Sequence, residues 1–191
     1  MSDPIKKNHT QASAKTFSPE DIELLDRMSR PELYEFFFMH IKNIWRVDGL
    51  YFLGIERRQG TTEATDVDAE CWAYMGKAEA RELKQFLKKE NPGPNEILET
   101  LRHTAWSFCH GLKHYRVNQD NSATFIVEKC RTQLIRLEKG LDPHPCRRVR
   151  EGYLKAFVKE LNPKVEVVAT CCPPDRDRED IWCQWEFVLR A

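Results

Sequence analysis

The chain has 191 residues, enough for one domain or for one domain with a helical extension. Its 30 basic and 30 acidic residues balance, which excludes the basic surplus typical of a nucleic-acid-binding face. The mean hydropathy is -0.63, and no apolar run approaches the roughly 20 residues that span a bilayer. The polar segment 1–17 lacks the apolar core of a secretory signal. We therefore expect a soluble, cytoplasmic protein with no nucleic-acid or membrane partner.

The first half of the chain has helical periodicity. Segment 1–17 predicts a disordered tail, and 18–112 predicts a helical region. Ser18 and Pro19 are typical of a helix start, because serine caps a helix and proline fits its first turn. This first helix should run to about Met28. Further helices are expected, with glycine or proline between them, over 29–48, 50–58, 64–89 and 96–112.

The second half has short segments that are rich in β-branched and aromatic residues, a composition typical of strands. A helix is expected over 151–161, a hairpin turn over 118–122, and the segment 131–139 is ambiguous. The fold class is therefore α+β, with N-terminal helices followed by an antiparallel sheet that carries a crossing helix and ends in a terminal β-hairpin. Residues 113–191 form an α+β, cysteine-containing region within one compact domain that includes the helical region. The expected strands are 114–118, 124–130, 165–170 and 181–189.

Cysteines beside turn-forming residues are the main candidate functional feature. The chain has 7 cysteines, and in a reducing compartment such thiols are metal ligands, reactive groups or buried apolar residues. If the last two strands form a hairpin, Cys171 or Cys172 comes near Cys183, and Cys146 precedes the helix that packs on that hairpin. Three thiolates in a tetrahedral array suit zinc, with His144, Asp175 or water completing the shell.

Other interpretations of these residues stay open. One alternative is that the cysteines are buried in the core as small apolar residues. One of them can instead be a nucleophile activated by His144, Arg147 or Arg148, and an iron–sulfur cluster is a further alternative. His110 and His114 share a helix face if the helix continues, but exposed histidines at a helix end explain them better.

Several runs resemble a family of bacterial proteins, the L-2-amino-thiazoline-4-carboxylate hydrolase-like group. The similar residues are the run 49–56 with Gly60, the segments 68–72 and 76–81, and the tail segments 172–175 and 182–187. The similarity covers most of the chain beyond the N-terminal tail. It implies hydrolytic opening of a cyclic C=N substrate.

The C-terminal half also resembles the 4-vinyl reductase ligand-sensing domain. That family places one cysteine before a helix and two more on a terminal hairpin, an order that Cys146, Cys172 and Cys183 repeat. In some members these cysteines hold zinc beside a pocket for aromatic ligands. Zinc-binding members also use a glutamate shortly before the first hairpin cysteine, where this chain has 167–170 without one. The resemblance implies that Cys171 takes the place of this glutamate as a zinc ligand.

Together these features predict a small-molecule hydrolase with a cysteine-ligated metal site formed by Cys146, Cys171, Cys172 and Cys183. His144 and Glu56 are the candidate catalytic residues, acting as proton shuttles for a metal-bound hydroxide. Two further residues, Trp182 and Arg147, are the candidate substrate-binding side chains. The competing prediction is a non-catalytic ligand sensor with a closed, structural zinc site. The sequence leaves open a homodimer.

Overall fold

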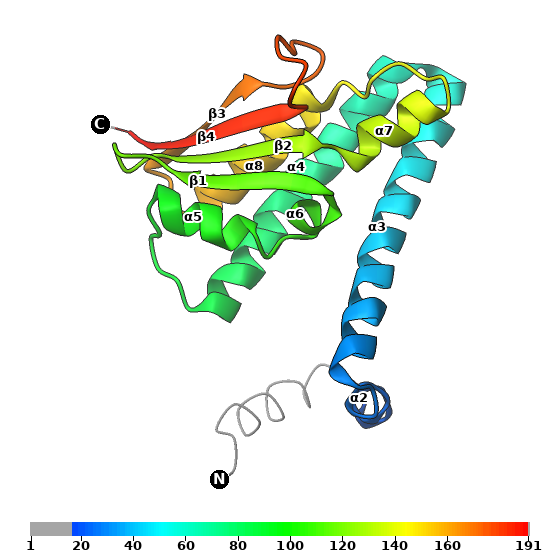
Figure 1. Cartoon of the computed structure of the whole chain (residues 1–191), viewed down its shortest axis with the longest axis vertical. Helices are drawn as coiled ribbons and strands as arrows, with labels where there is room; N and C mark the ends of the chain where they lie inside the picture. Colours follow the sequence, from blue (N-terminus) through cyan, green and yellow to red (C-terminus); the bar gives the residue numbers. More distant parts are fainter. Residues whose placement is uncertain (1–16, 191) are drawn as a thin grey trace. The chain divides into compact units, whose positions relative to one another are not determined.

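The computed structural model describes residues 17–190, so the predicted tail lies, apart from Phe17, outside the described residues. The chain divides into two compact units, Met1–Asn43 and Ile44–Ala191, and each is described by itself. The second unit contains the sheet and the candidate site (Figure 1).

In the first unit, helix α2 spans Pro19–Asp26. The side chain of Ser18 accepts a hydrogen bond from the backbone N–H of Asp21 at 3.1 Å, which confirms the predicted cap. Helix α3, Arg30–Gln59, begins in this unit and continues into the second. The predicted break at Asp48-Gly49 is wrong, because one glycine in a long helix costs only about 1 kcal/mol.

The second unit contains the remaining helices. The expected single helix over 96–112 is two short helices. The first ends at Leu101 with Arg102 as its C-cap, and Thr104 caps the second by accepting a hydrogen bond from the N–H of Ser107. The ambiguous segment 131–139 is helical. The helix expected from Glu151 begins five residues earlier, and its N-cap position has no side-chain hydrogen bond that would mark it in the sequence. These helices are α4 Thr61–Leu87, α5 Pro94–Leu101, α6 Ala105–Cys109, α7 Arg131–Glu138 and α8 Cys146–Leu161.

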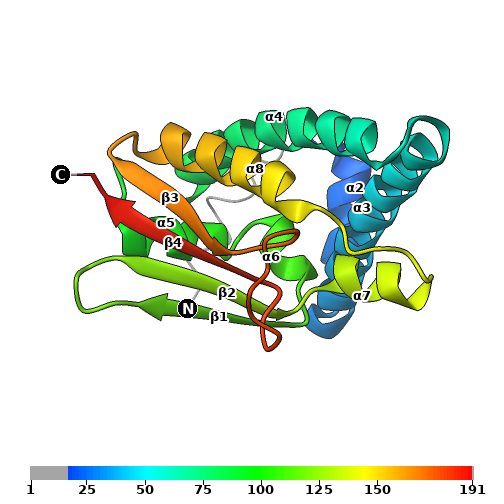
Figure 2. The ribbon, with the colours of Figure 1, turned by 90° about the horizontal axis from the view of Figure 1, so that it is seen from above.

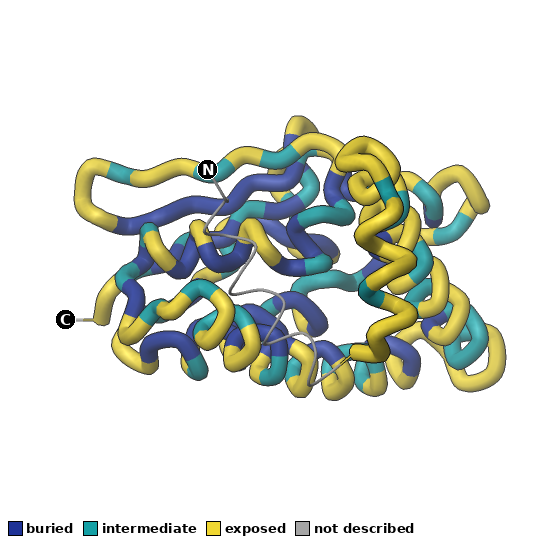
Figure 3. Tube along the Cα trace, turned by 90° about the horizontal axis from the view of Figure 1, so that it is seen from below, coloured by how far each residue is buried: buried dark blue, intermediate teal, exposed yellow. Residues whose placement is uncertain are grey.

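The four strands of the described chain form one antiparallel sheet in the order β1-β2-β4-β3. The α+β class and the terminal hairpin between β3 and β4 are therefore confirmed. Strand β2 is buried for most of its length, whereas the edge strand β1 is largely exposed (Figure 3). The strands are β1 Leu112–Val117, β2 Ala123–Lys129, β3 Val165–Cys171 and β4 Cys183–Leu189.

Helix α8 lies alongside α4 and packs on strand β3, while α5 packs on β2 and β4 (Figure 2). One face of α8 carries an apolar stripe at helical spacing, and this stripe is fully buried. The core of the unit therefore sits between the sheet and these helices. Its members on α8 are Val149, Tyr153, Leu154, Phe157, Val158 and Leu161.

A buried polar contact fixes α8 against α4. The hydroxyl of Tyr153 donates to the carboxylate of Glu79 at 2.7 Å, and the same carboxylate accepts from the N–H of Ala105 at 3.0 Å. Burial is the main cause that raises the pKa of Glu79, and the two hydrogen bonds oppose it.

Among the helices of residues 17–190, none combines the length and the apolar character needed to cross a membrane.

Close approach of α4 to α8 gives a stability prediction. A Cβ atom added at Gly76 would clash with the backbone oxygen of Tyr153 and reach its ring at 3.0 Å. We expect Gly76→Ala to lower the free energy of unfolding by about 1–3 kcal/mol, measured by urea denaturation. Gly54→Ala is the matched control, since Gly54 is also helical and a Cβ there has nothing within 4 Å. That control should be neutral or stabilising by up to about 1 kcal/mol, and equal losses in the two variants would contradict the close packing.

Candidate functional site

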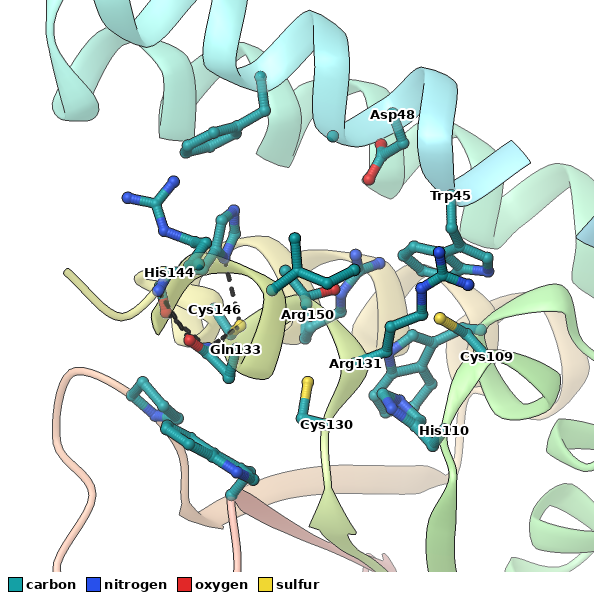
Figure 4. Close-up of a pocket in the computed structure, with 18 of the residues that line it drawn as sticks. Trp45, Asp48, Cys109, His110, Cys130, Arg131, Gln133, His144, Cys146 and Arg150 are labelled. Atoms are coloured by element: carbon teal, nitrogen blue, oxygen red, sulfur yellow. Dashed lines mark hydrogen bonds between the residues drawn. The ribbon is translucent and has the colours of Figure 1, made fainter. Parts of the chain in front are cut away.

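A cavity of about 260 Å³ lies within the second unit. One wall is a single face of α3, on which Trp45, Asp48 and Phe52 recur at helical spacing. Other walls come from α6, the end of β2, α7 and the start of α8 (Figure 4). The cavity is mainly apolar with a few charged groups, which is the usual make-up of a small-molecule site.

Arg150 of α8 is a buried cation of the cavity wall, with 6% of its surface exposed. Its guanidinium lies over the ring of Trp72 at 4.1 Å and over Trp45 at 5.1 Å. These two rings stack at a centroid distance of 5.0 Å. The Nη1 atom of Arg150 is buried and has no hydrogen-bond partner, so the cavity presents an unsatisfied donor with a positive charge.

His110 lies at the same end of the cavity, beside Trp106 at a centroid distance of 5.2 Å (Figure 4). Both of its ring nitrogens are buried without a hydrogen-bond partner. Burial, assisted by the charges of Arg150 and Lys113, lowers its pKa to about 3. The ring is therefore neutral at physiological pH and offers one donor and one acceptor.

Four thiols interact with one another, three of them in the cavity lining, and we call them the thiol cluster: Cys130, Cys146, Cys172 and Cys183. The thiols of Cys172 and Cys183 are hydrogen-bonded to each other, which raises the pKa of Cys172 and lowers that of Cys183. Burial raises the pKa of Cys130 to about 12, and Cys183 adds to the shift. Burial also raises the pKa of Cys146, with further contributions from Cys130 and Cys183.

A histidine connects the thiol cluster to a carboxylate. His144 Nδ1 is 3.2 Å from Cys146 Sγ, and its Nε2 is 3.5 Å from an oxygen of Asp68 on α4. The amide of Gln133 donates to Cys146 Sγ at 2.9 Å and to the backbone oxygen of His144 at 2.9 Å. His144 and Cys146 both line the cavity. The imidazole is thus held between a thiol and a carboxylate, an arrangement that suits proton transfer.

Four of the eight candidate residues lie outside the cavity lining, and Glu56 and Arg147 are two of them. Glu56 accepts two hydrogen bonds from Arg136, at 3.0 and 2.9 Å, and one from Thr61 at 3.0 Å. The hydrogen bonds from Arg136 lower the pKa of Glu56 most strongly. Arg147 forms an ion pair with Asp175 at 2.8 Å. The structure therefore places both residues in contacts that hold loops and helices together.

The other candidates separate into two groups. Trp182, Cys146 and Cys183 line the cavity, as His144 does. Cys172 belongs to the thiol cluster, whereas Cys171 packs with Ile126 and Ile181 in a separate group of buried apolar residues. Within residues 17–190, no three cysteine, histidine or acidic side chains already stand at metal-binding geometry.

Sequence reasoning missed Cys130, Gln133 and Arg150. Cys130 follows a strand without turn-forming neighbours, so it lacks the signal that marked the other thiols. Arg150 had a readable signal, since it lies three, four and seven residues before Tyr153, Leu154 and Phe157 on the buried face of α8. A charged residue on such a face is the sign of a buried, specific role.

Comparison with known proteins identifies the family. A model for a family of unknown function, DUF6125, matches residues 26–189, so the chain belongs to that family. No curated protein and no solved structure matches the chain.

Buried, neutral His110 gives a pH prediction. The unfolded chain protonates this ring below a pKa of about 6.5, whereas the folded protein resists protonation until about 3. The folded state therefore loses stability as the pH falls through this window. Between pH 7 and pH 5 we expect the wild type to lose about 2 kcal/mol more than His110→Gln, measured by urea denaturation. Equal losses would show that the folded protein accommodates a charged ring.

Proposed function

We propose that the protein is a small-molecule hydrolase that opens a cyclic substrate at a C=N bond of the thiazoline type. The observation that supports this proposal is the contact between Cys146, His144 and Asp68 at the cavity wall. All 7 cysteines are free, which agrees with a reducing, cytoplasmic location.

The thiol cluster is the proposed metal site, and its donor chemistry fits the group. Four sulfur ligands suit zinc, and Cys130 takes the position first assigned to Cys171. Burial keeps the thiols protonated, so binding must release protons and the affinity should rise steeply with pH. A zinc ion held by three of the thiols would lower the pKa of a bound water toward neutrality.

The protein's own residues supply the proton chemistry. His144 removes a proton from water, the hydroxide adds to the carbon of the C=N bond, and His144 passes this proton to the substrate nitrogen. The hydroxyl of the adduct then gives its proton to His144 as the C=O bond forms and a ring bond from that carbon breaks, and His144 delivers this second proton to the leaving atom. One water is consumed in total. Asp68 stabilises the imidazolium and fixes the orientation of the ring.

A second function, a non-catalytic ligand sensor, is favoured by the number of thiols. Four thiolates would close the zinc shell and exclude water from the metal, leaving it a structural role. Cys172 and Cys183 are 1% and 7% exposed, which suits a closed site. A third alternative, Cys146 as nucleophile, uses the same His144 contact, but burial raises the pKa of this thiol and opposes thiolate formation.

The hydrolase proposal is tested with 2-amino-thiazoline-4-carboxylate as the probe, followed by mass spectrometry for the gain of one water. We expect turnover in the wild type and a fall in kcat of about 10²–10⁴-fold in His144→Gln. Asp68→Asn should lower kcat less, because it keeps the shape of the contact. Cys71→Ser, at an exposed position, is the control and should keep full activity. Turnover unaffected in His144→Gln would refute the role of this histidine.

Metal analysis separates the enzyme from the sensor. One zinc per chain with four protected thiols, and no turnover, would support the sensor. Zinc with Cys146 freely alkylated would leave an open position for water. In both cases Cys183→Ser should lose the metal and lower the melting temperature, because metal binding is coupled to folding. Unchanged zinc content in this variant would exclude the thiol cluster as the metal site.

A further inference from the structure

The cavity holds a buried cation without an anion. Guanidinium groups in protein interiors are normally hydrogen-bonded and paired, because an unpaired buried charge is strongly unfavourable. Arg150 departs from this rule, since its Nη1 has no partner and no carboxylate of the described residues forms an ion pair with it. The rings of Trp45, Trp72 and Trp106 offset part of the charge but satisfy no N–H group in the plane.

Two acids of the described chain, Asp48 and Glu79, interact electrostatically with Arg150, but neither forms an ion pair with it. Asp48 interacts electrostatically with Arg150, but its carboxylate accepts a hydrogen bond from Trp72 Nε1 at 3.0 Å. Burial and the charge of Asp68 raise the pKa of Asp48, which weakens it as a counter-ion. Arg131 and Lys139 also line the cavity. The walls therefore carry more positive than negative charge.

His110 adds a second group that lacks a partner at the same end of the cavity. Two unsatisfied ring nitrogens and one unsatisfied guanidinium nitrogen occur together among aromatic side chains. Buried polar groups without partners are rare, so several around one cavity point to a missing ligand. That ligand must accept from a cation, hydrogen-bond to a neutral imidazole, and present a flat apolar surface to the rings.

We propose that the cavity binds a small planar carboxylate, with one carboxylate oxygen accepting a hydrogen bond from Arg150 Nη1 and a second polar group of the ligand facing His110. This rests on the proposed function only in taking the cavity as the ligand site. A single carboxylate fits better than a phosphate, because the buried groups without a partner, Arg150 Nη1 and the neutral His110 ring, supply one positive charge between them and cannot compensate a buried dianion. The cavity, at about 260 Å³, fits one or two fused rings.

The alternative is a structural role, in which Arg150 only braces α3, α4 and α6 through their tryptophans. That role predicts no preference for an anionic ligand over a neutral one of the same shape. Comparing a carboxylate with the neutral amide of the same shape therefore distinguishes the structural role of Arg150 from the binding role, without any mutation.

Binding of benzoate and 2-naphthoate to the full-length protein is measured by tryptophan fluorescence and calorimetry. Benzamide and 2-naphthamide serve as neutral counterparts and phenyl phosphate as the dianion. We expect at least one carboxylate to bind, and its amide and the phosphate to bind at least about tenfold more weakly. Amide binding equal to carboxylate binding, or no carboxylate binding at about 10 mM, overturns the proposal. Tighter binding of phenyl phosphate than of the carboxylates would also overturn the proposal, and would identify a phosphate as the ligand group.

Variants of α8 test the residue itself. Arg150→Gln should weaken carboxylate binding at least about tenfold while leaving amide binding unchanged, and Arg150→Lys should retain part of the preference. The control is Arg148→Gln, since Arg148 lies on the same helix but pairs with Asp66 at the surface. Equal affinity in Arg150→Gln and wild type would refute the assignment. If Arg150→Gln fails to fold, the comparison of ligands in the wild type still decides.

The two proposals fail in different ways. Carboxylate binding without hydrolysis would refute the hydrolase proposal and support the assignment of Arg150 as the carboxylate-binding residue. Hydrolysis of a substrate whose neutral amide is hydrolysed equally well would refute the assignment of Arg150 and support the hydrolase proposal.

Discussion

The packing of α8 is the contact on which the rest of the second unit depends. Its apolar stripe is buried against the sheet and α4, and Gly76 lets the backbone of Tyr153 approach α4 closely. The hydrogen bond between Tyr153 and Glu79 then fixes the rotation of the helix. Because Cys146 and Arg150 occupy the first turns of the same helix, this packing also sets the position of both residues in the cavity wall.

The thiol cluster depends on loops rather than on helices. Cys172 and Cys183 flank the loop between β3 and β4, and Cys130 follows β2. Gln133 connects this region to His144, since it hydrogen-bonds both backbone groups of that residue as well as Cys146. The amide thus holds the segment before α8 in place, and the histidine is oriented before any ligand arrives.

Periodicity and turn chemistry predicted the class of the fold and the terminal β-hairpin, because the apolar pattern of each segment depends on local geometry. Boundaries failed where no local signal exists, as at Cys146, or where the local signal was too weak to break a long helix, as at Gly49. Among the site residues, Cys146, Cys183 and His144 were predictable from their neighbours. Cys130 and Gln133 were not, since only the pairing of β2 with β4 brings them near the others.

Helix α8 also fixes the spacing between Cys146 and Arg150. Arg150 lies four residues after Cys146, so a little over one turn, about 6 Å along the axis, separates the backbone positions of the two residues. A packed helix cannot stretch, so the interval is the same for every ligand. If Arg150 holds the ligand's carboxylate as proposed, only the ligand atom at the matching distance reaches Cys146. Under the proposed hydrolase function, shorter or longer substrates would bind and yet misplace the reacting bond, so the site would discriminate substrates by the distance between the carboxylate and that bond.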